Sequence, residues 1–113
     1  MDTMKELQDE VARYLDAKGK DWSSIDNHYF HFTFLVEEIG ELAHDIINIE
    51  AKIKEPNREG SNQTKEEMLG RIRRELGDIL YHIFGISYAY GIDTEDAFKA
   101  ALQDIKQRYP SKP

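Results

Sequence analysis

The chain has 113 residues, of which 33% are charged, and its formal net charge is -7 at pH 7. A chain of this length fits one domain with a single modest core, so we expect residues 1–113 to form one domain. The excess negative charge argues against a nucleic-acid duplex or an anionic membrane surface as partner, because both would be repelled. A small anionic substrate is compatible where a bound cation or local Lys and Arg side chains reverse the sign of the field.

The sequence has no cysteine and no apolar segment of the length that spans a bilayer. The lack of cysteine excludes disulfides, thiolate nucleophiles and zinc–thiolate sites. Residues 1–10 alternate charged and apolar side chains and lack the continuous apolar run of a signal peptide. We therefore expect a cytoplasmic protein.

Apolar residues at helical spacing predict a first helix from about Thr3 to Lys18, with Gly19 placed to end it. Residues 20–30 follow as an irregular connection that is rich in Asp, Ser and aromatic residues. This connection contains the only tryptophan of the chain, Trp22.

The second predicted helix runs from about Phe32 to Lys54. Its apolar residues alternate spacings of four and three, which is the heptad pattern of a helix that packs along one seam. The members of this seam are Leu35, Ile39, Leu42, Ile46, Ile49 and Ile53. Residues 54–63 are strongly polar and contain Pro56 and Gly60, so we expect a loop there.

Thr64 opens the third predicted helix, because its hydroxyl can cap the helix while Glu67 reaches back to the backbone. The helix continues to about Tyr90, and Gly91 supplies the stop. Its seam follows the same heptad pattern through Leu69, Ile72, Leu76, Ile79, Ile83, Ile86 and Tyr90. Thr94 is the expected N-cap of a fourth helix, which a loose tail follows from Tyr109.

These segments predict an all-α, four-helix bundle-like fold with an antiparallel central helix pair, because short connections favour antiparallel neighbours. Further apolar residues lie outside the two seams, and one seam per helix cannot cover them. We therefore expect a homodimer or a homotetramer. The additional apolar residues are Phe34, Ala43, Ile47, Leu80 and Phe84.

Four acidic residues lie at matching places beside the two seams. Glu38 and Glu41 directly precede seam residues of the second helix, and Glu75 and Asp78 precede the equivalent residues of the third. In an antiparallel pair these two shoulders face each other, and a spacing of three residues stacks the acids on each helix. We therefore expect the four carboxylates to converge on one cleft.

Convergent carboxylates repel one another, by about 3 kcal/mol for a pair about 5 Å apart, and a divalent cation offsets that repulsion. Oxygen ligands select Mg²⁺ or Mn²⁺, and Mg²⁺ commonly completes its shell with substrate phosphates. The alternative is that the acids form a solvated helix face. Gly40 and Gly77 occupy equivalent places inside the two acidic pairs, which indicates either room for a close helix or ligand, or tight packing alone.

The string Glu37-Glu38-x-x-Glu41, followed by Glu75-x-x-Asp78, resembles the signature of the MazG-like, all-alpha nucleoside triphosphate pyrophosphohydrolases. The wider strings EEIGELAHDI and RELGDILYHI resemble the two central helices of that family. The resemblance implies cleavage of a nucleoside triphosphate between the α and β phosphates, which releases a nucleoside monophosphate and pyrophosphate. It also implies that Glu38, Glu41, Glu75 and Asp78 bind Mg²⁺, or Mn²⁺ in its place.

The resemblance suggests roles for further residues. Glu37 and Glu41 are candidate general bases. Lys106 and Arg108 resemble the basic segment that approaches the phosphates in many relatives, although cations at a helix C-terminus are equally plausible there. Trp22 and His31 resemble aromatic residues that contribute to the nucleobase pocket, with core packing as the alternative. Trp22, His31, Lys106 and Arg108 form our predicted substrate-binding set.

Two other functions fit parts of the pattern. Glu41-x-x-His44 matches an element of di-iron and di-manganese carboxylate bundles, but the third helix lacks its counterpart and His44 faces away from the shared shoulder. Alternatively, the acids solvate the surface of a helical dimerisation or regulatory module. We expect His82, one turn beyond Asp78, to be structural, and we expect most of Arg71, Arg73 and Arg74 to be surface or ion-pairing residues.

Overall fold

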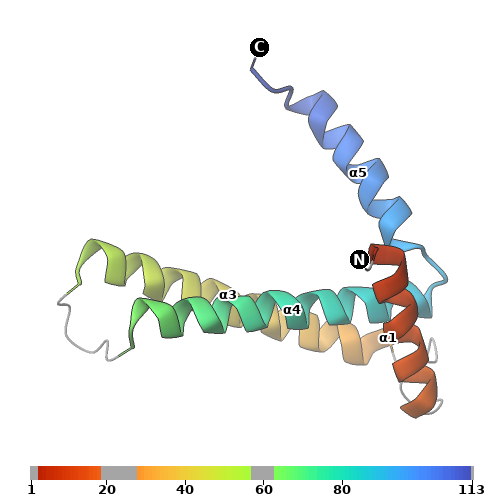
Figure 1. Cartoon of the computed structure of the whole chain (residues 1–113), viewed down its shortest axis with the longest axis horizontal. Coiled ribbons are helices and arrows are strands. Elements are labelled where there is room, and N and C mark those ends of the chain that lie inside the picture. Colours follow the sequence, from red (N-terminus) through yellow and green to blue (C-terminus); the bar gives the residue numbers. More distant parts are fainter. Residues whose placement is uncertain (1–2, 19–27, 57–62, 113) are drawn as a thin grey trace. The chain divides into compact units, whose positions relative to one another are not determined.

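The computed structural model describes residues 3–18, 28–56 and 63–112. Its helices are α1 (Met4–Lys18), α3 (His28–Lys54), α4 (Lys65–Ala89) and α5 (Thr94–Arg108), and no strand occurs among the described residues (Figure 1). The all-α prediction is confirmed. Within the described ranges, no helix is long and apolar enough to cross a membrane.

Helix α3 begins at His28, which is earlier than the predicted start near Phe32. The aromatic residues at this end form a cluster within the helix pair, because the Phe30 ring packs edge-on against His31 and lies 4.6 Å from the Phe34 ring. The prediction of an irregular connection is therefore wrong from residue 28 onward. Trp22 lies outside the described residues.

Helix starts follow the predicted capping chemistry with one correction. Thr64 Oγ1 accepts a hydrogen bond from the Glu67 backbone N at 3.1 Å, as the sequence indicated. Asp93, not Thr94, is the N-cap of α5, because its carboxylate accepts hydrogen bonds from the backbone N–H groups of Glu95 and Asp96. Gly91 adopts a φ of 67°, which confirms its role after α4.

The chain divides into two compact units. Unit one comprises Met1–His28 and Phe84–Pro113, and unit two comprises Tyr29–Ile83. Helix α4 contributes to both units, whereas most of α3 belongs to unit two. All four acids of the predicted metal site lie in unit two. The prediction that residues 1–113 act as one domain stays a prediction.

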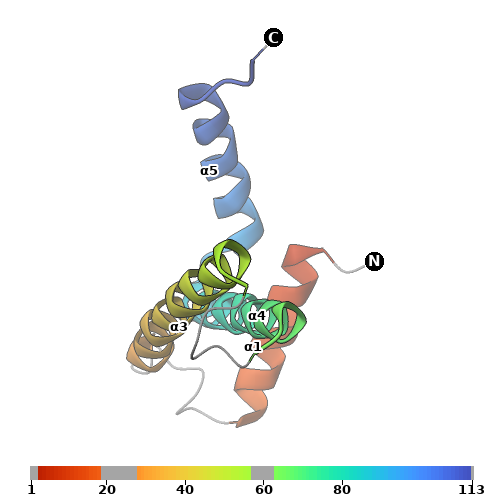
Figure 2. The same ribbon diagram turned by 90° about the vertical axis from the view of Figure 1, so that its left-hand side faces the viewer.

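Within unit two, α3 and α4 run antiparallel side by side (Figures 1 and 2). The contacts between the two helices keep one antiparallel register: moving 11 residues along α3, from Phe34 to Asp45, moves the contact 11 residues back along α4, from His82 to Arg71. The Phe34 ring stacks on His82 at one end of this register. Arg71 forms an ion pair with Asp45 at the other end. The predicted antiparallel central pair is therefore present.

The line of residues that packs between α3 and α4 differs from the predicted seam. Ile49 and Met68 are buried, but so are Asp45, Glu75 and His82. In contrast, alternate members of both predicted seams are about half exposed, namely Ile39, Ile46, Ile53, Leu69 and Leu76. Each helix is rotated so that its acidic shoulder faces the partner helix. The predicted heptad spacing is correct, but the residues that pack between α3 and α4 lie on a different line along each helix from the predicted seam.

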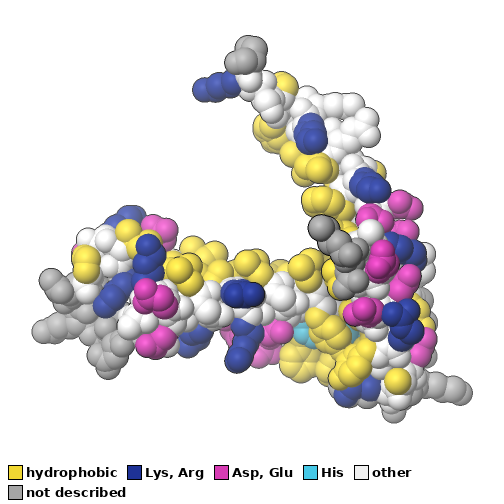
Figure 3. Space-filling model, viewed as in Figure 1, with side chains coloured by type: hydrophobic (Ala, Val, Ile, Leu, Met, Phe, Trp, Pro, Cys, Tyr) yellow, Lys and Arg dark blue, Asp and Glu magenta, His cyan; other side chains and the backbone are white. Residues whose placement is uncertain are grey.

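This rotation leaves a row of apolar side chains on the surface of the helix pair (Figure 3). Ile47 is the most exposed of them on α3, at 66%, and Leu80 on α4 is 46% exposed. A groove of about 400 Å³ runs along this face of α3, lined by Ile46, Ile47, Glu50, Ala51, Lys54 and Glu55. The surface is consistent with the predicted need for a partner, although the oligomeric state stays a prediction.

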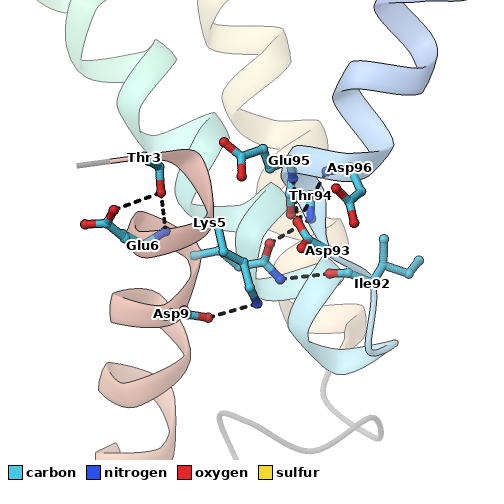
Figure 4. A network of polar contacts seen from close by, with 10 residues as sticks. Thr3, Lys5, Glu6, Asp9, Ile92, Asp93, Thr94, Glu95 and Asp96 are labelled. Atoms are coloured by element: carbon cyan, nitrogen blue, oxygen red, sulfur yellow. Dashed lines mark hydrogen bonds and ion pairs between the residues drawn. The ribbon is translucent and has the colours of Figure 1, made fainter. Parts of the chain in front are cut away.

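Unit one is held by a polar clamp between α1 and the connection from α4 to α5 (Figure 4). The buried Gln8 side chain donates a hydrogen bond to the Ile92 carbonyl at 2.8 Å and accepts one from the Thr94 backbone N at 2.7 Å. One side chain therefore satisfies two backbone groups next to the N-terminus of α5. Leu15 is fully buried on the same helix as Gln8.

Replacing Gln8 by Ala should lower the free energy of unfolding by about 2 kcal/mol, because two backbone groups lose their partner in a buried place. Urea denaturation followed by circular dichroism measures this change. Lys5→Ala is the matched control, because it removes an exposed ion pair with Asp9 and weaker charge interactions with Asp93 and Asp96, and it should have only a small effect. Equal losses in the two variants would contradict the clamp.

Candidate active site

The four predicted metal ligands come from both helices of unit two, and each pair is separated by one helical turn. Glu38 and Glu41 lie on α3, and Glu75 and Asp78 lie on α4. The charges of Glu41 and Asp78 both act on the Glu38 carboxyl, and the charge of Glu41 acts on Glu75. The antiparallel register therefore brings Glu38 towards Asp78 and Glu41 towards Glu75.

The four carboxyl groups differ in their access to water. Glu75 is buried, with 6% of its surface exposed, and Glu38 is half-buried. Glu41 and Asp78 are exposed. Burial raises the pKa of Glu38, and the negative charges of Glu41, Asp78 and Glu37 raise it further. The four acids thus range from one buried carboxyl group to two exposed ones.

Glu75 has the most perturbed carboxyl of the site. Burial raises its pKa to about 7, helped by a hydrogen bond with Asp45 and by the negative charges of Asp45 and Glu41. The nearby Arg71 guanidinium acts in the opposite direction. Glu75 Oε2 is buried and accepts no hydrogen bond from the described residues. A buried carboxylate oxygen without a donor favours a cation as partner.

Asp45 and Arg71 belong to this constellation, although neither was predicted as a site residue. Arg71 Nε donates to Asp45 Oδ2 at 3.3 Å, and Arg71 Nη2 lies 3.3 Å from Asp45 Oδ1. Asp45 follows Glu41 by one helical turn, and the sequence led us to expect that most of Arg71, Arg73 and Arg74 are surface or ion-pairing residues. The sequence did not indicate that Asp45 and Arg71 pair with each other across the two helices.

The donor set suits a hard divalent cation, because every candidate ligand is a carboxylate and one buried oxygen lacks a donor. Within residues 3–18, 28–56 and 63–112, no group of three or more His, Asp or Glu side chains is arranged so that it could hold a metal ion. The convergence of the four acids on one cleft therefore stays a prediction. Their assignment as Mg²⁺ or Mn²⁺ ligands stays a prediction.

Two buried histidines lie next to the acids. His31 Nδ1 and His82 Nδ1 are 3.0 Å apart, and only 2% of His31 is exposed. Phe34 and Tyr81 pack against this pair. Burial lowers the pKa of His82, against the opposing charge of Asp78. The expected structural character of His82 agrees with its place here, and His31 occupies the same packed cluster. A substrate contact by His31 stays a prediction.

Other predicted residues lie apart from this cluster. Lys106 and Arg108 belong to α5 in unit one, where Arg108 Nε lies 3.0 Å from Asp104 Oδ2. Their role with phosphates stays a prediction. The side chain of His44 is 71% exposed and forms a hydrogen bond with Asn48. His44 is therefore turned outward, as expected, which argues against the di-metal bundle.

The paired glycines do not mark a close contact between helices. A Cβ atom added at Gly40 or Gly77 would meet no atom within 4 Å among the described residues. The tight-packing explanation is therefore wrong for the structure of unit two. Space for a ligand beside the acids is the explanation that stays open.

The fold and the facing carboxylates define a class of all-α domains with an acidic site between two antiparallel helices. The model of the MazG nucleotide pyrophosphohydrolase domain family matches residues 27–112. The uncharacterised protein YvdC of Bacillus subtilis strain 168 is 29% identical over 76 residues, which cover 67% of this chain and 70% of that protein. No solved structure matches the chain.

The chain belongs to the MazG nucleotide pyrophosphohydrolase family, because the matched region includes both central helices and all four acids. This membership indicates nucleotide pyrophosphohydrolase activity, and members of the family generally depend on a divalent metal. The resemblance seen in the two acidic strings is therefore confirmed at the level of the family.

The raised pKa of Glu75 predicts a pH-dependent stability in metal-free buffer. The folded state keeps this proton up to about pH 7, whereas the ordinary pKa of a glutamate side chain is 4.5, so stability falls as the pH rises between these values. Glu75→Gln removes the ionisation and should raise the melting temperature at pH 8, with little change at pH 4.5. Melting curves in chelating buffer at both pH values measure this difference.

Glu50→Gln is the control, because Glu50 is an exposed acid of the same helix pair. Its effect on the melting temperature should be similar at both pH values. A Glu75→Gln variant whose effect is equally independent of pH would contradict the raised pKa.

Proposed function

We propose that the protein is a Mg²⁺-dependent nucleoside triphosphate pyrophosphohydrolase that cleaves between the α and β phosphates. The products are a nucleoside monophosphate and pyrophosphate. The observation that carries the proposal is the pairing of Glu38 with Asp78 and of Glu41 with Glu75 across α3 and α4. Family membership supports the class of reaction.

Glu38, Glu41, Glu75 and Asp78 would hold Mg²⁺, or Mn²⁺ in its place, through carboxylate oxygens alone. When bound, the cation supplies positive charge that neutralises phosphate oxygens and orients the triphosphate. The buried Glu75 gives this set one ligand that water does not reach, and the exposed Glu41 and Asp78 leave it open to a substrate from solvent. The donor set therefore suits a triphosphate that arrives together with its own hard cation.

The reaction requires a group that takes a proton from the attacking water. The water oxygen forms a bond to the α or the β phosphorus atom. The bond between that phosphorus and the α–β bridging oxygen breaks, and the bridging oxygen leaves with the other phosphate. The water proton passes to a carboxylate. Glu37 and Glu41 are the candidates, because both are exposed; Glu37 directly precedes the ligand Glu38 in the chain, and Glu41 is itself one of the proposed ligands. Glu37 lies close enough for its charge to act on Glu38.

Substrate binding is proposed for residues outside the acidic set. Lys106 and Arg108 carry the positive charge that phosphates require. Trp22 offers an aromatic face for a nucleobase. His31 is the fourth member of the set, and its burial beside His82 means that a direct contact requires a local opening of the helix pair.

A homodimer or homotetramer is proposed from the exposed seam of unit two. Ile39, Ile46 and Ile53 repeat at intervals of seven along α3 and are each about half exposed. A second copy of the chain presents the same repeat and could pack against it as a coiled-coil-like layer.

Incubation with Mg²⁺ and a panel of nucleoside triphosphates should yield monophosphate and pyrophosphate from at least one of them. Ion-exchange chromatography of the products distinguishes the cleavage sites. Release of diphosphate and orthophosphate would disprove the proposed cleavage position.

Replacing Glu38 by Gln should reduce the turnover number at least about 100-fold, because a ligand of the charged site is lost. It should also abolish the rise in melting temperature that Mg²⁺ causes in the wild type, while the metal-free protein becomes no less stable. Enzyme assays and melting curves with and without Mg²⁺ measure both effects. Glu50→Gln should retain activity and the full Mg²⁺ response. A Glu38→Gln variant with an unchanged response would count against the site.

Ile46→Lys should shift the chain towards the monomer, because a charge replaces an apolar side chain in the exposed seam. Analytical ultracentrifugation of wild type and variant measures the mass. Lys52→Glu on the same helix changes a charge away from that seam and serves as the control. A monomeric wild type would refute self-association.

A further inference from the structure

Asp45 and Arg71 lie one turn beyond the four acids, and neither belongs to the proposed ligand set. Asp45 follows Glu41 on α3, and Arg71 precedes Glu75 on α4. Arg71 holds the Asp45 carboxylate through two atoms, with distances of 3.3 Å from Nε to Oδ2 and 3.3 Å from Nη2 to Oδ1. Two-point contact with a planar guanidinium fixes both the position and the plane of a carboxylate.

Burial makes this contact necessary for Asp45. Only 4% of the Asp45 side chain is exposed, so water cannot replace a lost partner, whereas 51% of the Arg71 side chain is exposed. His44 Nδ1 also lies near Asp45, at 3.8 Å from Oδ1, but His44 adds charge only when it is protonated. Arg71 is therefore the permanent positive charge beside Asp45.

Asp45 in turn contacts the buried ligand. Its carboxyl group is within hydrogen-bonding reach of Glu75, which is itself 6% exposed. Glu75 Oε2 is buried and accepts no hydrogen bond from the described residues. A chain of contacts thus leads from the partly exposed Arg71 through Asp45 to Glu75.

We infer that Arg71 and Asp45 form a positioning pair that orients the Glu75 carboxylate towards a divalent cation. The inference rests on the proposed function, because it takes Glu75 as a metal ligand. Arg71 occupies both oxygens of Asp45 and so keeps that carboxylate out of the ligand set. Partners that orient a ligand in this way commonly change metal affinity by about 10- to 100-fold when they are removed.

The inference can be tested by the direction in which cation affinity changes when the charge of Arg71 is removed. Coulomb attraction and repulsion alone predict tighter cation binding when Arg71 is neutralised, because a positive charge near the site is lost. A positioning role predicts weaker binding. The two explanations therefore give opposite changes in the same measurement.

The experiment is a Mn²⁺ titration of the full chain without nucleotide, in which electron paramagnetic resonance reports free Mn²⁺. Arg71→Met should weaken Mn²⁺ binding about tenfold. Arg73→Met is the matched control, because it removes the same charge from an exposed position on the same helix. Its affinity should be unchanged or slightly tighter.

Asp45→Asn tests the second member of the pair and should also weaken binding about tenfold. The double variant should bind no more weakly than the weaker single variant, because both residues act through one chain of contacts. Arg71→Lys keeps the charge without the two-point geometry and should recover only part of the affinity. Melting curves show which variants are folded, and Arg71→Lys decides the case where Arg71→Met is not, because it changes the contact geometry without changing the charge.

Unchanged or tighter binding by folded Arg71→Met would overturn the inference and leave the proposed function intact. Additive losses in the double variant would also overturn it. A wild type that binds no Mn²⁺ would overturn both the pair and the proposed metal site. A wild type that binds Mn²⁺ but hydrolyses no nucleotide would overturn only the proposed reaction, because the titration still judges the pair.

Discussion

The packing of charged groups between α3 and α4 is the constraint on which unit two depends. Asp45 and Glu75 occupy buried places that apolar side chains fill in an ordinary heptad seam. Removing such groups from water is costly unless they are paired. The structure offsets this cost with the two-point contact from Arg71, and the raised pKa of Glu75 favours the neutral form of that carboxyl group. The helices therefore pack along their acidic sides, and part of their apolar surface stays exposed to solvent.

The same constraint gives the site its chemical character. Because the acids project from two rigid helices, their relative positions depend on helix packing more than on loop conformation. One ligand candidate, Glu75, is shielded from water, whereas Glu41 and Asp78 face the solvent from which a substrate arrives. Membership in the MazG family connects this geometry to nucleotide pyrophosphohydrolysis.

Local signals in the sequence predicted local structure well. The polar capping residue Thr64 and the glycine at position 91 act as expected, because their effects depend on backbone groups only a few residues away. The errors arose where two local signals competed. Asp93 and Thr94 are both good capping residues, and the choice between them depended on Gln8, which takes the Thr94 backbone N–H from another part of the chain. The early start of α3 depended similarly on aromatic packing against α4.

The sequence by itself determined the helical class, the approximate ends of the helices, the family signature and the matching places of the four acids. Only the tertiary structure decided which line along each helix is packed, and thus that Ile39 and Leu76 are exposed while Glu75 is buried. A heptad pattern gives the spacing of contacts but not the rotation of a helix about its own axis, because several neighbouring lines share that spacing. The rotation follows from pairs such as Asp45 and Arg71, which meet across 26 residues of sequence and leave no local trace.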